Sequence, residues 1–135
     1  MPRLSLTTKI KYDRKKMTQK EKELLLRDLC CRLPYGMNVE ANSYNTEIIG
    51  IKGTGIYTKR GIIYPIHVIK PYLRPLSSMT EEEKETYQMF FNEDGLVNTS
   101  IDTYVDWLLE GHFDFRGLIE KGLAIAAVGE NNPYK

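Results

Sequence analysis

The stretch "EGHFDFRG" contains the residues of this chain whose types and spacing are best suited to chemistry. His112, Asp114 and Arg116 alternate with Phe113 and Phe115, so an extended backbone would place the three polar side chains on one face. A histidine two residues before an aspartate is a spacing that can bind a metal ion. The first question is whether this stretch is a catalytic or metal-binding group, or a loop that locks two helices together.

The rest of the sequence argues against a metal site or an enzyme. A metal site needs three or four ligands, and the only other histidine is His67. No H-E-x-x-H motif, C-x-x-C motif or carboxylate-rich loop accompanies it. We therefore predict no catalytic residue, no metal and no cofactor, and we expect that the protein is not an enzyme.

The alternative interpretation of "GHFDFRG" is a structural corner, and we favour it. Asp114 would cap a helix that starts near Phe115, because polar residues at helix ends usually serve as caps. The two phenylalanines would anchor the turn in the core, and Arg116 would pair with Asp106 or Glu110. A binding surface at this corner is the second possibility.

The adjacent cysteines, Cys30 and Cys31, do not predict a disulfide framework or a reactive thiol. Neighbouring cysteines on a helix point in different directions and cannot staple a fold. Arg27 and Arg32 would activate a thiolate only weakly. We expect one buried thiol and one partly exposed thiol in a reduced, cytoplasmic setting.

The elements that must position these residues begin with a helix over residues 18–32. Thr18 followed by Glu21 forms a capping box, leucines follow at helical spacing, and Pro34 ends the helix. Over residues 37–69, short runs of isoleucine, valine, tyrosine and threonine alternate with glycine and asparagine turns. This pattern predicts a small twisted antiparallel sheet or barrel of three to four strands.

The C-terminal half is predicted to be helical over residues 80–127. Thr80 and Glu83 form a second capping box, and "NTSIDTYVDWLLEG" predicts a further helix that ends at Gly111. A short helix over "FRGLIEKG" and an apolar tail, "LAIAAV", which docks on the core or adds a strand, complete an α+β fold. Pro65 places the last strand at a sheet edge or bend, and "KPYLRPLSS" is expected to be an extended linker. We divide the chain into a basic arm, residues 1–16, and a single domain, residues 17–135.

Charge is strongly segregated along the chain, although the net charge is only +1. Residues 1–16 carry +5 and residues 33–76 carry +3, whereas residues 77–135 carry −8. Such fields steer association, so the asymmetry is the clearest global indication of a partner.

Two basic regions are candidate binding sites for nucleic acid or for an acidic protein groove. Cations beside exposed aromatic rings on a small sheet are a common way to hold single-stranded nucleic acid, although a solvated hairpin explains the second region better. The candidate residues are Lys9, Lys11, Arg14, Lys15 and Lys16 in the arm, with Lys52, Tyr57, Lys59, Arg60 and Tyr64 in the hairpin region.

The acidic helical half has the opposite character. Residues 81–83 are consecutive glutamates, and Asp102, Asp106 and Glu110 follow on the next predicted helix. This surface would repel phosphate. It either mimics phosphate in a basic groove of a nucleic-acid-handling protein or simply keeps the chain soluble.

The segments "EKELLLRDLCCRLPYG", "VIKPYLRPLSSMTEEE" and "DTYVDWLLEGHFDFRGLIEKGLA", in this order, resemble a family of small uncharacterised proteins. These occur in prophages and mobile elements of gut Bacteroidales. The resemblance covers residues 17–127, and residues 1–16 depart from the pattern. It brings no catalytic residues. It implies an intracellular phage or mobile-element setting, in which small accessory proteins often bind host machinery.

Two function classes follow from these observations. The first is a non-catalytic accessory protein that binds a host protein or ribonucleoprotein complex, with inhibition of a nucleic-acid-targeting defence system as its most concrete form. The second is direct binding of nucleic acid through the basic arm and the hairpin edge. No apolar run approaches the roughly 18 residues of a membrane span, so we expect no membrane partner.

Overall fold

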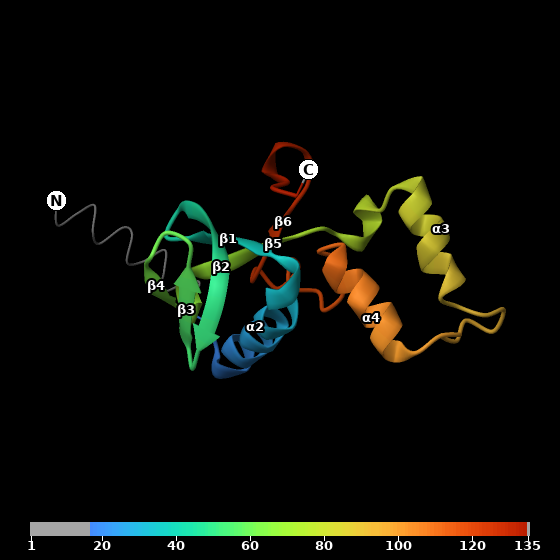
Figure 1. The fold of residues 1–135 in the computed structure, drawn as a ribbon, viewed down its shortest axis with the longest axis horizontal. Coiled ribbons are helices and arrows are strands. Elements are labelled where there is room, and N and C mark those ends of the chain that lie inside the picture. The colour runs from blue at the N-terminus through green and yellow to red at the C-terminus, as the bar shows by residue number, and fades with distance from the viewer. Residues whose placement is uncertain (1–16, 135) are drawn as a thin grey trace.

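A single sheet with one helix against it forms one part of the molecule, and two further helices form the other. The computed structural model describes residues 17–134. Figure 1 shows the sheet together with α2 on one side, α4 beside α2, and α3 beyond α4 at the other end. Within the described residues, no helix is long and apolar enough to cross a membrane.

Helix α2, Gln19–Arg32, begins at the capping box that its sequence predicts. The backbone N–H of Glu21 donates to the hydroxyl of Thr18, and the backbone N–H of Thr18 donates to the carboxylate of Glu21. Leu25 and Leu29 are fully buried against the sheet, and each contributes about 1.5–3 kcal/mol by leaving water. Both neighbouring cysteines are exposed, which contradicts the expectation that one of them is buried.

The chain is α+β overall, but the predicted small sheet or barrel of three to four antiparallel strands is wrong. The sheet is open, mixed and six-stranded, in the order β4-β3-β2-β1-β5-β6. All neighbours pair antiparallel except β5 and β6, which are parallel. The strands are β1 Met37–Ala41, β2 Tyr44–Lys52, β3 Gly55–Thr58, β4 Ile63–Pro65, β5 Ile69–Leu73 and β6 Ile125–Ala126.

Two strands, β5 and β6, lie almost entirely beyond the region in which the sheet was predicted, although the tail that forms β6 was expected to dock on the core or add a strand. Strand β5 lies in the segment expected to be a linker, and it contains Pro71, which pairs with Val39 of β1. The proline is tolerated because β6 pairs only with Tyr72 and Leu73, so no strand lies beside Pro71 on that side. Strand β6 is the apolar tail docking back on the sheet. Pro65 lies in the edge strand β4, as its sequence predicts.

The second part of the molecule is an extended lobe, residues 79–112, which contains α3, Glu81–Met89, and α4, Ile101–Glu110. Both helices have the expected polar caps, Thr80 with Glu83 for α3 and Ser100 for α4. The short helix predicted after α4 does not form. Gly117 has a φ of +73°, which is incompatible with a continued α-helix, so residues 115–122 form turns instead.

The buried side chains divide unequally between the two parts. The main core lies between α2 and the inner face of the sheet, and it includes Met37, Val39 and Ile56. The lobe has a smaller cluster around Leu108 and Phe113. This second cluster lies where the lobe meets the sheet part, so the "GHFDFRG" stretch sits at the junction.

Candidate functional site

The corner formed by "GHFDFRG" is a structural junction. Its backbone joins the end of β5, because the N–H of Arg74 donates to the carbonyl of His112 at 2.7 Å and the N–H of Asp114 donates to the carbonyl of Arg74 at 2.8 Å. His112 has a φ of +61°, which is uncommon for a residue other than glycine. The polar side chains of the stretch therefore point in different directions and do not form a common face.

Asp114 and Arg116 both serve to hold the corner. The carboxylate of Asp114 accepts hydrogen bonds from the backbone N–H groups of Leu118 and Ile119, each at 2.9 Å, so it caps a turn rather than a helix. The expected pairing of Arg116 with Asp106 or Glu110 is wrong. Arg116 instead donates to Asp28 of α2 at 3.0 Å.

Asp28 is the centre of a buried charge network. It is fully buried and accepts from Arg32, also fully buried, at 2.7 and 3.2 Å. Arg32 donates in addition to the carbonyl of Phe113 at 2.7 Å, which ties the C-terminal end of α2 to the corner. Both arginines pair with this one carboxylate, so removing it would leave both guanidinium groups without their ion-pair partner.

The His112 side chain packs against an aromatic ring. Its ring stacks on Tyr134, with 3.7 Å between the ring centroids. Burial, with the nearby cations Arg32 and Arg74, lowers the pKa of His112 to about 4, so the imidazole is neutral near pH 7. Within residues 17–134, no three histidine, cysteine or acidic side chains gather as metal ligands.

The structure does not bring the predicted hairpin residues into one surface. Tyr57 and Tyr64 point to opposite faces of the sheet, because Tyr57 pairs with Ile63 while Tyr64 pairs with the buried Ile56. Tyr57 is exposed, whereas Tyr64 is only 5% exposed. Tyr64 therefore belongs to the core and cannot stack on a base, which corrects its place among the candidates.

The basic residues of the hairpin are also separated or already paired. Lys52 is the last residue of β2 and pairs with Gly55 at the start of β3, whereas Lys59 follows the end of β3, so the two lysines lie about 14 Å apart along the strand at 3.4 Å per residue. Lys59 forms an ion pair with Glu47 at 3.1 Å. The guanidinium of Arg60 lies 3.9 Å from the ring centroid of Tyr44. The arm candidates, Lys9, Lys11, Arg14, Lys15 and Lys16, lie outside the described residues.

The lobe gathers an aromatic cluster between its two helices. Phe90 and Tyr104 lie 5.5 Å apart between ring centroids, and Phe90 and Trp107 lie 5.6 Å apart. Trp107 stacks on the buried Phe113 at 5.5 Å, which joins the cluster to the corner. The aromatic side chains of α3 and α4 are only partly buried, so their rings form a semi-exposed seam rather than a closed core.

A pocket of about 300 Å³ opens at the inner end of this seam. It is lined by Glu82, Glu83, Thr86, Trp107, Glu110, Gly111 and Phe113. Gly111 is required there, because a Cβ at this position would lie 2.5 Å from the Phe113 ring. The pocket thus combines aromatic surface with carboxylates from both helices, which is a suitable lining for a cation.

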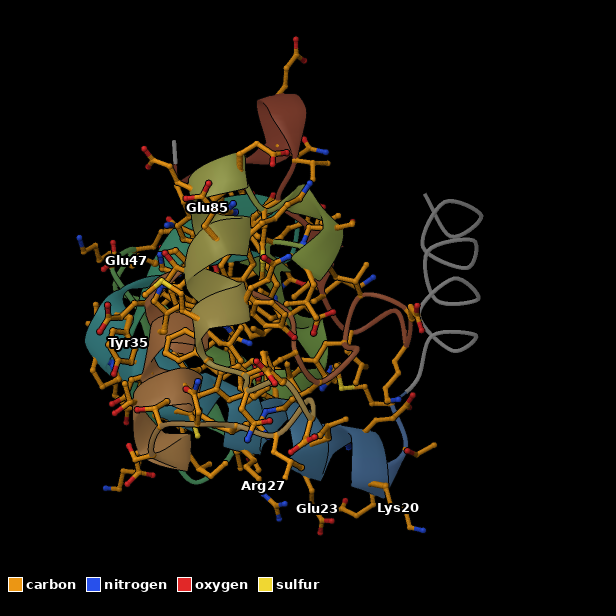
Figure 2. All side chains as sticks on the ribbon, turned by 90° about the vertical axis from the view of Figure 1, so that its right-hand side faces the viewer. Lys20, Glu23, Arg27, Tyr35, Glu47 and Glu85 are labelled. Atoms are coloured by element: carbon orange, nitrogen blue, oxygen red, sulfur yellow. The ribbon has the colours of Figure 1, made fainter. Side chains whose placement is uncertain are left out.

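The outer surface of the lobe is acidic on its sides and apolar at its tip. Figure 2 looks at the molecule from the lobe's side, with Glu85 on α3, and with Tyr35, whose hydroxyl donates to Asp106 of α4 at 3.3 Å. At the loop end, Met89, Leu96 and Ile101 are 75%, 64% and 60% exposed. The acidic residues of the lobe are evident in the sequence, but no sequence pattern predicts the pocket or the apolar tip.

No family model matches this chain, and no curated protein or solved structure matches it either.

Proposed function

We propose that the protein is a non-catalytic accessory protein that docks its α3–α4 lobe on a basic surface of a host complex that handles nucleic acid. The supporting observation is the lobe itself. Residues 79–112 contain nine acidic residues and one basic residue, Lys84, and this charged surface surrounds an exposed apolar tip. Interfaces commonly combine an apolar centre with a charged rim that selects the partner.

The proposal retains the setting implied by the sequence resemblance, which is a cytoplasmic phage or mobile-element protein that acts on host machinery. Inhibition of a nucleic-acid-targeting defence complex is its most specific form. An acidic lobe in a nucleic-acid groove would compete with phosphate for the same cations. Figure 1 shows α3 and the loop after it farthest from the sheet, with α4 beside α2, so α3 and the loop tip are the parts best placed to enter a groove.

Direct nucleic-acid binding through the arm and the hairpin edge is the second candidate. Its support is the exposed ring of Tyr57, together with the stacked pair of Arg60 and Tyr44. The ion pair between Lys59 and Glu47 and the burial of Tyr64 weaken it.

A capture experiment with matched variants tests both candidates. The tagged full chain is incubated with host lysate before and after nuclease treatment, and bound proteins are quantified by mass spectrometry. One variant replaces the apolar tip, Met89→Ser with Leu96→Ser and Ile101→Ser. The control variant changes the hairpin, Lys59→Glu with Arg60→Glu.

If the lobe is the docking surface, host proteins should remain bound after nuclease treatment. They should be lost with the tip variant and retained with the hairpin variant. Binding that persists in the tip variant would remove the lobe as the docking surface. If nuclease releases everything and the hairpin variant captures nothing, the chain binds nucleic acid. In that case a labelled single-stranded oligonucleotide would show affinity that falls steeply as salt is raised.

A further inference from the structure

The inner wall of the lobe pocket already holds one guanidinium group. Arg74 donates to both carboxylate oxygens of Glu83, at 2.6 and 2.8 Å. The same guanidinium lies 4.3 Å from the ring centroid of Phe113. The Arg74 side chain lowers the pKa of Glu83 to about 2, so this carboxylate stays charged and Arg74 is neutralised by its partner.

The aromatic surface continues from this buried arginine toward the open part of the pocket. Phe113 stacks on Trp107 with an angle of 24° between the ring planes. Trp107 is partly exposed and lines the pocket. Phe113 is fully buried, so Trp107 is the aromatic ring of the pocket lining that remains accessible to a second cation.

Two further carboxylates line this open space. Glu82 comes from α3 and Glu110 from the end of α4, and both are exposed residues that line the pocket. In residues 17–134, neither forms an ion pair. Because Glu83 already neutralises Arg74, the charge that an incoming cation meets in the pocket is negative.

We propose that the pocket binds one arginine side chain from a basic segment of the partner, with its guanidinium against Trp107 and its N–H groups donating to Glu82 and Glu110. This inference rests on the proposed function of the lobe and names the group that the lobe recognises. A planar guanidinium stacks on a ring and pairs with carboxylates at once, whereas an ammonium does so less well. A volume of about 300 Å³ is at the small end for ligand pockets, which fits one side chain rather than a folded segment.

The chain's single tryptophan makes the test direct, because Trp107 lies in the pocket. Three basic peptides without tryptophan or tyrosine, identical except for a central arginine, lysine or citrulline, are titrated into the full chain while Trp107 fluorescence is recorded. We expect the arginine peptide to bind roughly tenfold more tightly than either of the others, the order expected when one ion pair and one stacked contact are lost.

Matched variants assign the effect to the pocket. Glu82→Gln and Glu110→Gln should each weaken the arginine peptide several-fold, while Glu23→Gln, at an exposed position of α2 outside the lobe, should leave its affinity unchanged. A Trp107→Phe chain, monitored by calorimetry, should bind the arginine peptide more weakly, because phenylalanine attracts a cation less than tryptophan does.

Each outcome separates this inference from the proposed function. Equal binding of the arginine and lysine peptides would overturn the arginine preference while leaving an acidic docking surface. If no peptide changes the fluorescence while the tip variant still abolishes capture from lysate, the pocket inference fails and the lobe proposal stands. If no peptide changes the fluorescence and the tip variant still captures its proteins from lysate, both the pocket inference and the lobe proposal are overturned.

Discussion

The sheet part and the α3–α4 lobe are stabilised in different ways. In the sheet part, apolar side chains from α2 and five strands meet in a closed core, and residues such as Leu25, Val39 and Ile69 have no exposed surface. In the lobe, α3 has no buried residue at all, and the aromatic rings are half exposed. The sheet part is thus a stable base, and the lobe is an appendage whose surface is available to a partner.

Polar contacts at the corner join the two parts, in addition to the apolar cluster around Leu108 and Phe113. Arg32 reaches the carbonyl of Phe113, Arg116 reaches Asp28, and Arg74 pairs with Glu83. A charge change removes a charged contact directly, whereas it leaves the burial of apolar side chains in place. The comparison therefore predicts that a charge change within the lobe will loosen the lobe without damaging the sheet, whereas a charge change at Asp28, on α2, will destabilise the whole chain.

The largest expected effect comes from Asp28→Asn. The substitution keeps the shape of the side chain but leaves the buried Arg32, which cannot lose its proton, without a counter-charge. We expect the free energy of unfolding to fall by about 3–5 kcal/mol, the range seen when one partner of a buried ion pair is removed. Equilibrium urea unfolding, monitored by far-UV circular dichroism, measures it.

The control for Asp28 is Asp94→Asn, in the exposed loop of the lobe. Its effect should stay within about 0.5 kcal/mol, as for most surface substitutions. If Asp28→Asn cost no more than this control, the buried network would contribute nothing to the junction, and other contacts would have to hold the corner.

A smaller and more local effect is expected for Glu83→Gln. The amide can still accept the capping bond from the backbone of Thr80, but it loses the charged pair with Arg74. Charge-assisted hydrogen bonds contribute about 1.5–3 kcal/mol, so we expect a loss of about 1–2 kcal/mol. Hydrogen exchange should become faster in α3 and stay unchanged in β1 and β2, because only the lobe is released.

Glu82→Gln is the matched control for this prediction, since it changes the preceding residue of the same helix but forms no ion pair within residues 17–134. Faster exchange spread evenly over the sheet and the lobe would contradict the comparison. It would mean that the two parts open together as one cooperative unit.

The elements governed by local signals were predictable from sequence. The capping boxes of α2 and α3 involve residues three apart, and both form as expected. Strand β2 shows the limit of such signals, because Ile49 and Ile51 are two residues apart and a regular strand would place both on one face. A bulge between Ile48 and Gly50 shifts the register, so Ile48 is buried and Ile49 is 60% exposed.

The contacts that define the candidate site depend on residues far apart in the sequence. Asp28 and Arg32 have the spacing of an ordinary surface pair on a helix, and only the tertiary fold buries them. Arg116 lies 88 residues from its partner. The pocket depends on the separation of α3 and α4, which no sequence pattern specifies, although their acids were evident from the composition.

The last expected effect is a pH dependence that originates at the corner. The pKa of His112 is about 4 in the folded chain, against an ordinary value of 6.5, because burial and the cations Arg32 and Arg74 oppose its protonation. Between these two values the unfolded chain binds the additional proton. His112 therefore contributes stability that is fully present above pH 6.5 and is lost as the pH falls toward 4, by at most about 1.4 kcal/mol per pH unit.

Urea unfolding of the native chain and of His112→Asn, at pH 7 and at steps down to pH 5, measures this slope. Asparagine tolerates the positive φ of this position and does not titrate, so the variant should lose the slope even if losing the stack on Tyr134 lowers its stability. His67→Asn, at an exposed histidine, should retain the slope. An unchanged slope in His112→Asn would place the acid sensitivity elsewhere and would mean that the corner does not oppose protonation of His112.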